Sequence, residues 1–151
     1  MDERALVDAL AATPTRLRDL FEGVDDDVAR RRPSPDAWSA VDVLTHLRAC
    51  DAIVLSRVPQ ILVRPGLPLP GLDEVAYGRL LRRAEPSVAE QMQAFAARRA
   101  ELVALLEKLA PDEWGLAGRH EELGDVSIRR IIEHAVAHEA EHVAQVEAVL
   151  P

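Results

Sequence analysis

The sequence predicts an all-α protein, a four-helix bundle with a long proline-rich crossover between the second and third helices. Four segments place apolar residues at the three- and four-residue spacing of an amphipathic helix, and none shows a convincing strand alternation. A length of 151 residues with 48% hydrophobic content suits a single core. We therefore expect residues 1–151 to form one helical domain.

The first two helices have recognisable boundaries in the sequence. We expect the first from about Glu3 to Phe21, interrupted or kinked at Pro14, because proline has no backbone N–H to donate. The second begins after Ser39, a residue type that caps helices well, and Asp42 supplies a weaker version of the capping-box acid. These two residues mark the start of the second helix.

The third and fourth helices follow two breaks in the helical pattern. Four prolines between Pro59 and Pro70 exclude a continuous helix there, and the segment is too long for a simple turn, so we interpret it as a crossover. The third helix is expected from about Ser87 to Leu109. A glycine-containing linker then leads to Ser127, which can cap the last helix.

Charge and composition exclude several classes of function. The formal net charge of −8 argues against a nucleic-acid partner, because phosphate binding depends on clustered Lys and Arg. No apolar run approaches the roughly 20 residues of a membrane span, and the charged N-terminus is unlike a signal peptide. A single cysteine, Cys50, excludes an internal disulfide framework and fits a reducing compartment. We expect a cytoplasmic protein that binds neither nucleic acid nor a membrane.

The last helix carries three of the five histidines at successive intervals of four residues, His134, His138 and His142. Each step of four residues turns the stripe by about 40° and advances it by about 6 Å along the helix axis. His134 and His142 are therefore about 12 Å apart along the axis, too far for both to bind one ion. At most two of the three histidines serve one metal, and a further ligand must come from elsewhere.

Two other histidines can supply that ligand, His46 in the second helix and His120 in the linker before the last helix. A rigid helix is the better platform for a ligand, and His46 shares one stripe of its helix with Cys50 and Ile53. The periodicity does not show which stripe of the second helix meets the last helix. The ligand set therefore stays open on the residues alone.

Two motifs of the chain resemble those of a known family. WSAVDVLTHL places a histidine seven residues after its Trp-Ser, and HEAEHVAQV carries HxxxH followed by Gln. These motifs, with the lead-in segments RRRPSPDAWS and RHEELGDVSI, resemble the DinB/YfiT-like superfamily. The resemblance implies a four-helix bundle with a long crossover, and a divalent metal held by His46, His138 and His142. His134 matches a family position that is often histidine without being a ligand.

Further residues near the histidines have more than one interpretation. Glu139 falls on the apolar face of the last helix, where it could orient a ligating histidine, bind the metal, act as a general base or form a buried salt bridge. Gln145 could hydrogen-bond a ligand, cap the site or lie at the rim of the helix. Cys50 is more often a small core residue than a nucleophile or a fourth ligand. For His120 we expect a loop or capping role.

Three histidine ligands leave a coordination position open, where a water or a substrate thiol becomes easier to deprotonate. Imidazole ligands suit several divalent ions, among which we expect zinc or nickel. The resemblance implies a metal-dependent enzyme acting on a small molecule. The reaction that the resemblance suggests is the transfer of a low-molecular-weight thiol (mycothiol, bacillithiol or glutathione) to a small electrophile, or a related hydrolysis.

The alternative function is a non-catalytic helical bundle stabilised by its metal, or an interaction module. Small side chains also line the outer side of the last helix and permit close approach of another helix, at Ala137, Ala140 and Ala144. Relatives in the family are often dimers. We therefore expect a homodimer.

Overall fold

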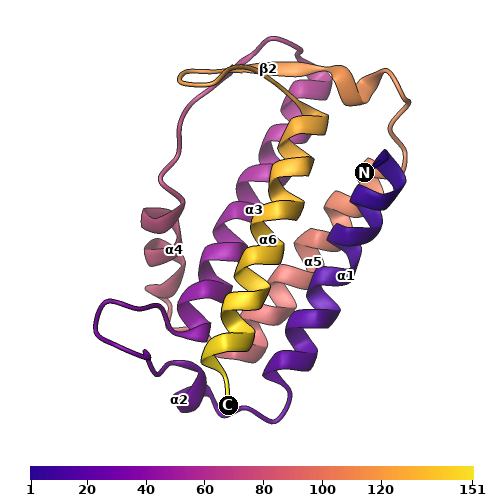
Figure 1. Ribbon diagram of the computed structural model, residues 1–151. Helices are drawn as coiled ribbons and strands as arrows, with labels where there is room; N and C mark the ends of the chain where they lie inside the picture. The colour runs from indigo at the N-terminus through magenta and orange to yellow at the C-terminus, as the bar shows by residue number, and fades with distance from the viewer.

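The computed structural model describes residues 1–151, in which four long helices form the predicted bundle (Figure 1). These are α1 (Glu3–Phe21), α3 (Ala40–Val63), α5 (Val88–Leu106) and α6 (Ile128–Val149). Helix α3 packs against α5 and α6, and α1 packs against the same two helices, so α1 and α3 lie diagonally across the bundle. The two helices that carry the histidine motifs, α3 and α6, are therefore neighbours.

Hydrogen bonds at the start of α3 confirm the predicted cap. The Ser39 hydroxyl accepts from the backbone N–H of Asp42 (3.1 Å), and the Asp42 carboxylate accepts from the backbone N–H of Ser39 (3.0 Å). This is a complete capping box, in which each residue satisfies a free donor of the other. Ser127 caps α6 in the same sense, by accepting from the backbone N–H of Arg130 (3.2 Å).

Two prolines lie inside helices, and the interruption expected at Pro14 does not occur. Helix α1 continues through Pro14, and α3 continues through Pro59 for four more residues to Val63. Each proline removes one hydrogen bond from its helix, which packing can offset. In α3 the residues on either side of the proline, Val58 and Ile61, are fully buried in the core, and their burial holds the last turn in place.

The crossover contains structure that periodicity did not reveal. Helix α4 (Glu74–Arg82) begins at Asp73, whose side chain accepts from the backbone N–H of Ala76 (2.8 Å). It packs along α3, and Gly78 lies beside the backbone of Thr45 and His46. In Figure 1 this short helix stands outside the four-helix bundle, next to α3. One side of α4 thus borders the helix that carries His46.

A small sheet closes one end of the bundle, although no strand was predicted (Figure 1). Its strands are β1 (Pro68–Leu69), β2 (Ala117–His120) and β3 (Gly124–Ser127), in the order β1-β2-β3. Strands β1 and β2 pair in parallel and β2 and β3 pair antiparallel. Strands of two to four residues are too short to show an alternating pattern. Two further short helices are α2 (Asp26–Ala29) and the 3₁₀ turn η1 (Glu113–Gly115).

The buried interior consists of two hydrophobic clusters separated by a polar layer. One cluster lies toward the sheet and includes Leu10 and Leu102, and the other includes Leu17 and Phe95. Between them each long helix contributes one buried polar residue, and these four residues are here named the polar layer: Thr13, Asp51, Arg99 and Glu139. None of the helices is both long enough and apolar enough to cross a membrane.

Candidate metal centre

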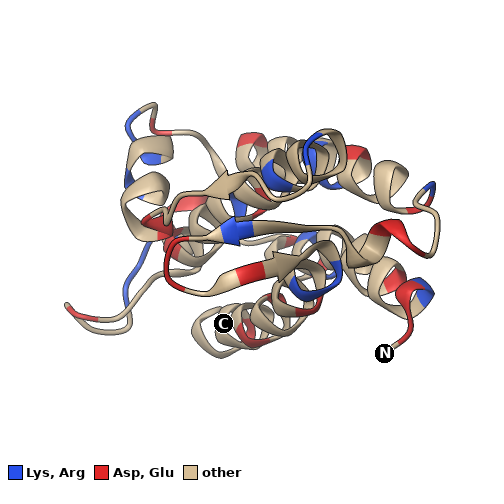
Figure 2. Cartoon of the chain, turned by 90° about the horizontal axis from the view of Figure 1, so that it is seen from above, with Lys and Arg blue, Asp and Glu red and all other residues tan.

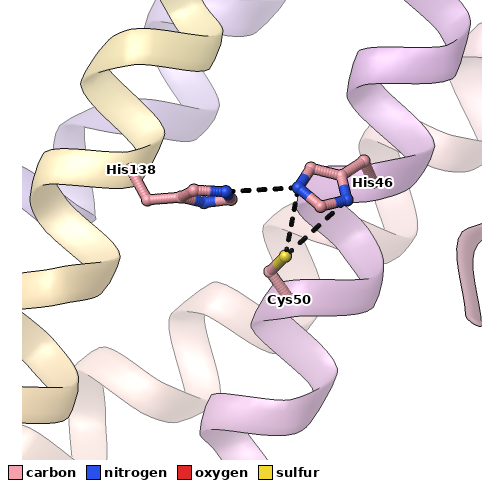
Figure 3. Close-up of side chains that lie close together, drawn as sticks. All are labelled: His46, Cys50 and His138. Carbon is pink, nitrogen blue, oxygen red and sulfur yellow. Dashed lines mark hydrogen bonds between the residues drawn. The ribbon is translucent and has the colours of Figure 1, made fainter. Parts of the chain in front are cut away.

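Three of the five histidines meet between α3 and α6. The Nε2 atom of His138 lies 3.2 Å from Nε2 of His46 and 3.1 Å from Nε2 of His142. Figure 3 shows His46 and His138 pointing toward one another from the two helices. The stripe of α3 that faces α6 is therefore the one that carries His46, which the sequence pattern had left open.

A hydrogen bond outside this group fixes the proton on one ring. Nδ1 of His142 lies 2.8 Å from Oε1 of Gln145, which can only accept, so Nδ1 carries the proton. The Nε2 atom of His142 then presents a lone pair toward His138. Gln145 thus orients a candidate ligand, which is one of the roles predicted for it.

Two of the three separations between the ring nitrogens, those that include His138, fit a divalent ion. Nitrogen ligands about 2.0–2.1 Å from a tetrahedral zinc ion are about 3.3–3.4 Å from one another. The observed separations of 3.1 and 3.2 Å are close to that spacing. Without a cation, nitrogen lone pairs at this distance repel one another unless one ring donates a proton. The donor set is therefore suited to zinc or a similar ion.

The protonation of these rings also favours metal binding. Burial lowers the pKa of His46 to about 4, with the neighbouring His142 and His138 adding to the shift. Burial and the same kind of repulsion lower the pKa of His138. Neutral imidazole is the form that ligates a metal, so two of the three rings are in the binding form at neutral pH.

Cys50 gives the centre a second candidate arrangement. Its Sγ atom lies 3.6 Å from Nε2 of His46, and His46, Cys50 and His138 offer ligand atoms within 4.8 Å of one another (Figure 3). Burial, with the charges of Glu74, Glu139 and Asp51, raises the pKa of the thiol to about 12. A bound cation would reverse this preference, because a coordinating thiol is deprotonated. His46 and His138 belong to both arrangements.

Aromatic packing holds two of the rings in place. The Trp38 ring lies 5.0 Å from the His46 ring and 6.0 Å from the His142 ring, measured between centroids, and it stacks on the latter. The tryptophan immediately precedes the Ser39 cap, so the capping box also fixes the position of the indole. Trp38 therefore packs against two of the candidate ligands.

Glu139 is buried, as its place on the apolar face predicted, and it forms an ion pair with Arg99 in the polar layer. Both its oxygens accept from the guanidinium of Arg99, and Oε2 also accepts from the Thr13 hydroxyl (2.8 Å). Arg99 also donates to Oδ1 of Asp51 from Nε (3.0 Å) and Nη2 (2.7 Å). These contacts match the salt-bridge interpretation, and no histidine bonds to Glu139. A role as general base stays a prediction.

The structure places the other two histidines outside the group of ring nitrogens. His134 is exposed, and its ring stacks on that of His138 at 5.7 Å between centroids. His120 lies at the end of β2, and its Nδ1 accepts from the backbone N–H groups of Glu122 and Leu123 (3.2 and 3.3 Å). The loop role expected for His120 is confirmed.

A cavity of about 530 Å³ borders the candidate ligands. His46, Cys50 and His138 contribute to its wall, and about half of its lining residues are apolar. It also contains four charged residues that the sequence interpretation did not single out, Asp51, Arg57, Glu74 and Arg130. They lie on α3, α4 and α6, far apart in the sequence. Glu74 reaches the cavity because α4 packs beside α3, and this packing is not visible in the sequence.

Comparison with known proteins agrees with this fold. The solved structure of YfiT from Bacillus subtilis, described as a probable metal-dependent hydrolase with an unusual four-helix bundle topology, superposes with a TM-score of 0.87 at 16% sequence identity. The match covers 97% of this chain and 85% of that one. A comparison with curated proteins finds no match. The family model of the DinB superfamily matches residues 9–146, and the chain belongs to that superfamily.

Proposed function

We propose that the protein is a cytoplasmic metal-dependent enzyme that transfers a low-molecular-weight thiol to a small electrophile. The observation that carries this proposal is the meeting of three imidazole rings, two of which, His46 and His138, line a cavity large enough for a small-molecule substrate. A metal that served only to stabilise the bundle would have no need of such a cavity. The cavity therefore favours catalysis over the non-catalytic alternative.

His46, His138 and His142 are the proposed ligands of a divalent ion, zinc or nickel. A divalent ion held there would supply a Lewis acid that lowers the pKa of an adjacent thiol or water. Cys50 beside His46 is small and half-buried, which keeps the cavity side of the centre free of a bulky side chain. In the transfer, the thiolate sulfur forms a bond to an electrophilic carbon, and a halide leaves or an epoxide oxygen takes up a proton.

The cavity also suggests which thiol is used. The guanidinium groups of Arg57 and Arg130 line it, and neither forms an ion pair with a carboxylate of the chain. Arginine presents a planar set of donors that matches a carboxylate. Glutathione and bacillithiol carry carboxylates and mycothiol does not. We therefore expect one of the first two thiols, with the apolar part of the cavity receiving the electrophile.

Hydrolysis is the second candidate reaction, and the description of YfiT as a probable metal-dependent hydrolase favours it. The same centre would then activate water, and an ester or amide would occupy the apolar part of the cavity. The two reactions differ in their need for a thiol. Turnover of the substrate in the absence of any thiol would favour the hydrolase.

The metal-loaded protein is expected to accelerate conjugation of glutathione or bacillithiol to an aryl halide or an epoxide, and chelation should abolish the rate. Replacing Arg130 by glutamine should raise the KM for the thiol about tenfold with little change in kcat, because a charged hydrogen bond contributes about 1.5–3 kcal/mol. Arg119→Gln, at an exposed position in β2, is the matched control. An uncatalysed rate with every thiol and every ester would contradict the proposed enzyme.

We also propose that two chains associate through the outer side of α6. Three small exposed residues lie on this side, Ala137, Ala140 and Ala144. Light scattering of the purified protein is expected to give the mass of a dimer, and Ala140→Glu should return a monomer with unchanged helix content. A monomer at all working concentrations would contradict this assembly.

A further inference from the structure

A second hollow, of about 590 Å³, lies at the end of α4, and all its lining residues except Pro86 are polar or charged. It is here named the arginine hollow, and its donor-bearing residues are Arg30, Arg79, Arg82, Arg83 and Gln91. Figure 2 shows basic segments (blue) on α4, at the left of the view. Four arginines around one polar hollow are a marked local excess of positive charge in a chain whose net charge is −8.

The positive charge of the arginine hollow is only partly balanced by the chain. Arg82 pairs with Asp42, and Arg30 lies 3.7 Å from Asp26. The two remaining arginines are Arg79 and Arg83, and neither forms an ion pair. The single carboxylate in the lining, that of Glu85, is exposed to solvent. Like charges gathered without counter-charges repel one another, so an anion in this hollow would be stabilised.

A buried amide donor in the wall of the hollow has nothing to donate to. Gln91 is fully buried, and its Oε1 accepts from the Thr45 hydroxyl (2.8 Å) and from Nη1 of Arg48 (3.2 Å). Because a guanidinium can only donate, this contact fixes which end of the amide is oxygen. The amide nitrogen, Nε2, is buried and has no hydrogen-bond partner. A buried donor left in this way is costly unless a ligand accepts from it.

Arg48 extends the same imbalance into the protein. It is buried, forms no ion pair, and its Nε atom also lacks a hydrogen-bond partner. Burial, with the nearby charge of Arg98, lowers its pKa. Through the bond to Oε1 of Gln91, its positive charge lies directly behind the wall of the hollow. Donors and positive charge are thus present in excess of acceptors.

We propose that the arginine hollow binds a small oxyanion of the phosphate class, either inorganic phosphate or a phosphomonoester. Arginine forks and an amide N–H match the several acceptor oxygens of a phosphate group. A neighbouring hollow of about 400 Å³ shares Arg79 and Arg82 and is also lined by Trp38 and His46. That hollow gives room for the organic part of a monoester next to the arginines.

Isothermal titration in a chloride buffer with inorganic phosphate, glycerol 3-phosphate and succinate as separate ligands tests this site. The double variant Arg79→Gln/Arg83→Gln should bind phosphate at least about tenfold more weakly than the wild type, because it loses two charge-assisted contacts. Arg18→Gln/Arg64→Gln, which removes the same charge at exposed positions elsewhere, should bind as the wild type does. Both variants should retain the same metal content, since no proposed ligand is changed.

A second variant, Gln91→Glu, tests the buried donor. The new carboxylate would keep the contacts to Thr45 and Arg48 and would supply the missing negative charge. We expect a higher melting temperature without ligand and no further rise with phosphate.

In the titration of the wild type, tighter binding of glycerol 3-phosphate than of phosphate would identify a monoester site. Absence of phosphate binding, equal binding of succinate, or undiminished binding by the double arginine variant would overturn the proposal.

Discussion

Replacing His138 by alanine is expected to reduce the affinity for a divalent ion by more than about 100-fold, whereas His134→Ala should leave the ion bound. Loss of a group that merely orients a ligand already costs about 10–100-fold in metal affinity, and loss of a ligand costs more. His138 is the central member, because its Nε2 lies within 3.2 Å of both other ring nitrogens. Metal content after dialysis, measured by mass spectrometry on both variants, checks the prediction.

The remaining single variants separate the two candidate arrangements. Alanine at His46 or His142 should release the ion, and alanine at His120 should not, because that ring is engaged in its own turn. If Cys50→Ala releases the ion and His142→Ala retains it, the ligands are instead His46, Cys50 and His138. Full retention of the metal after His46→Ala would contradict both arrangements, since each needs His46 as its histidine ligand from α3.

Helix starts were the part of the fold that local sequence determined best. The box formed by Ser39 and Asp42, and the cap at Ser127, act over three residues and depend on no distant contact. The apolar face of the last helix was also predicted, and two of its residues, Ile132 and Val146, are fully buried. Order and spacing along one helix are local properties, so a single sequence can show them.

Features that depend on distant contacts were not predictable. The extension of α3 past Pro59 depends on burial of Val58 and Ile61 against other helices, which outweighs the lost hydrogen bond. Strand β1 exists because β2, about 50 residues later, pairs with it. Helix α4 is mostly exposed, and its register is set by contact with α3. Local propensity contains none of this information.

The candidate site also has parts that the sequence predicted and parts that it did not. The spacing of His138 and His142 placed both on one side of the last helix, and the family resemblance supplied His46. Arg99, however, was overlooked as the partner of Glu139, although a signal was present. It lies four residues after Phe95 and three before Leu102, in the middle of an apolar stripe. A charged residue in such a position predicts a buried partner of opposite charge.

The polar layer links this ion pair to the candidate metal centre. Asp51 directly follows Cys50, and Glu139 directly follows His138. Arg99 bonds to both carboxylates and so fixes how α3 and α6 are rotated about their axes. That rotation brings the ring nitrogens of the two helices together. The layer is therefore a positioning element for the centre as well as a contribution to stability.

Replacing Arg99 by methionine is expected to lower the free energy of unfolding by about 3–5 kcal/mol, because two buried carboxylates lose their counter-charge. Methionine retains an apolar stem where the guanidinium packs over the Phe95 ring, 4.8 Å from its centroid, so the loss reports the charge. Arg4→Met removes an exposed pair with Asp8 and should cost less than about 1 kcal/mol. Urea denaturation of the three proteins gives the values.

The cost of Arg99→Met should also depend on pH. Burial raises the pKa of both Asp51 and Glu139, and Arg99 opposes this rise. Without Arg99 both pKa values move further above the unfolded value of about 4, so the folded variant binds more protons than the unfolded chain. Its stability therefore falls as pH rises through the raised pKa values, and the difference from wild type should be smaller at about pH 5 than at about pH 8.

Glu139→Gln should likewise lose stability and keep its metal, because Glu139 contacts Arg99 and Thr13 and no histidine. Release of the ion by Glu139→Gln would make Glu139 a ligand, and an Arg99→Met stability within 1 kcal/mol of wild type at both pH values would show that the layer does not hold the helices together.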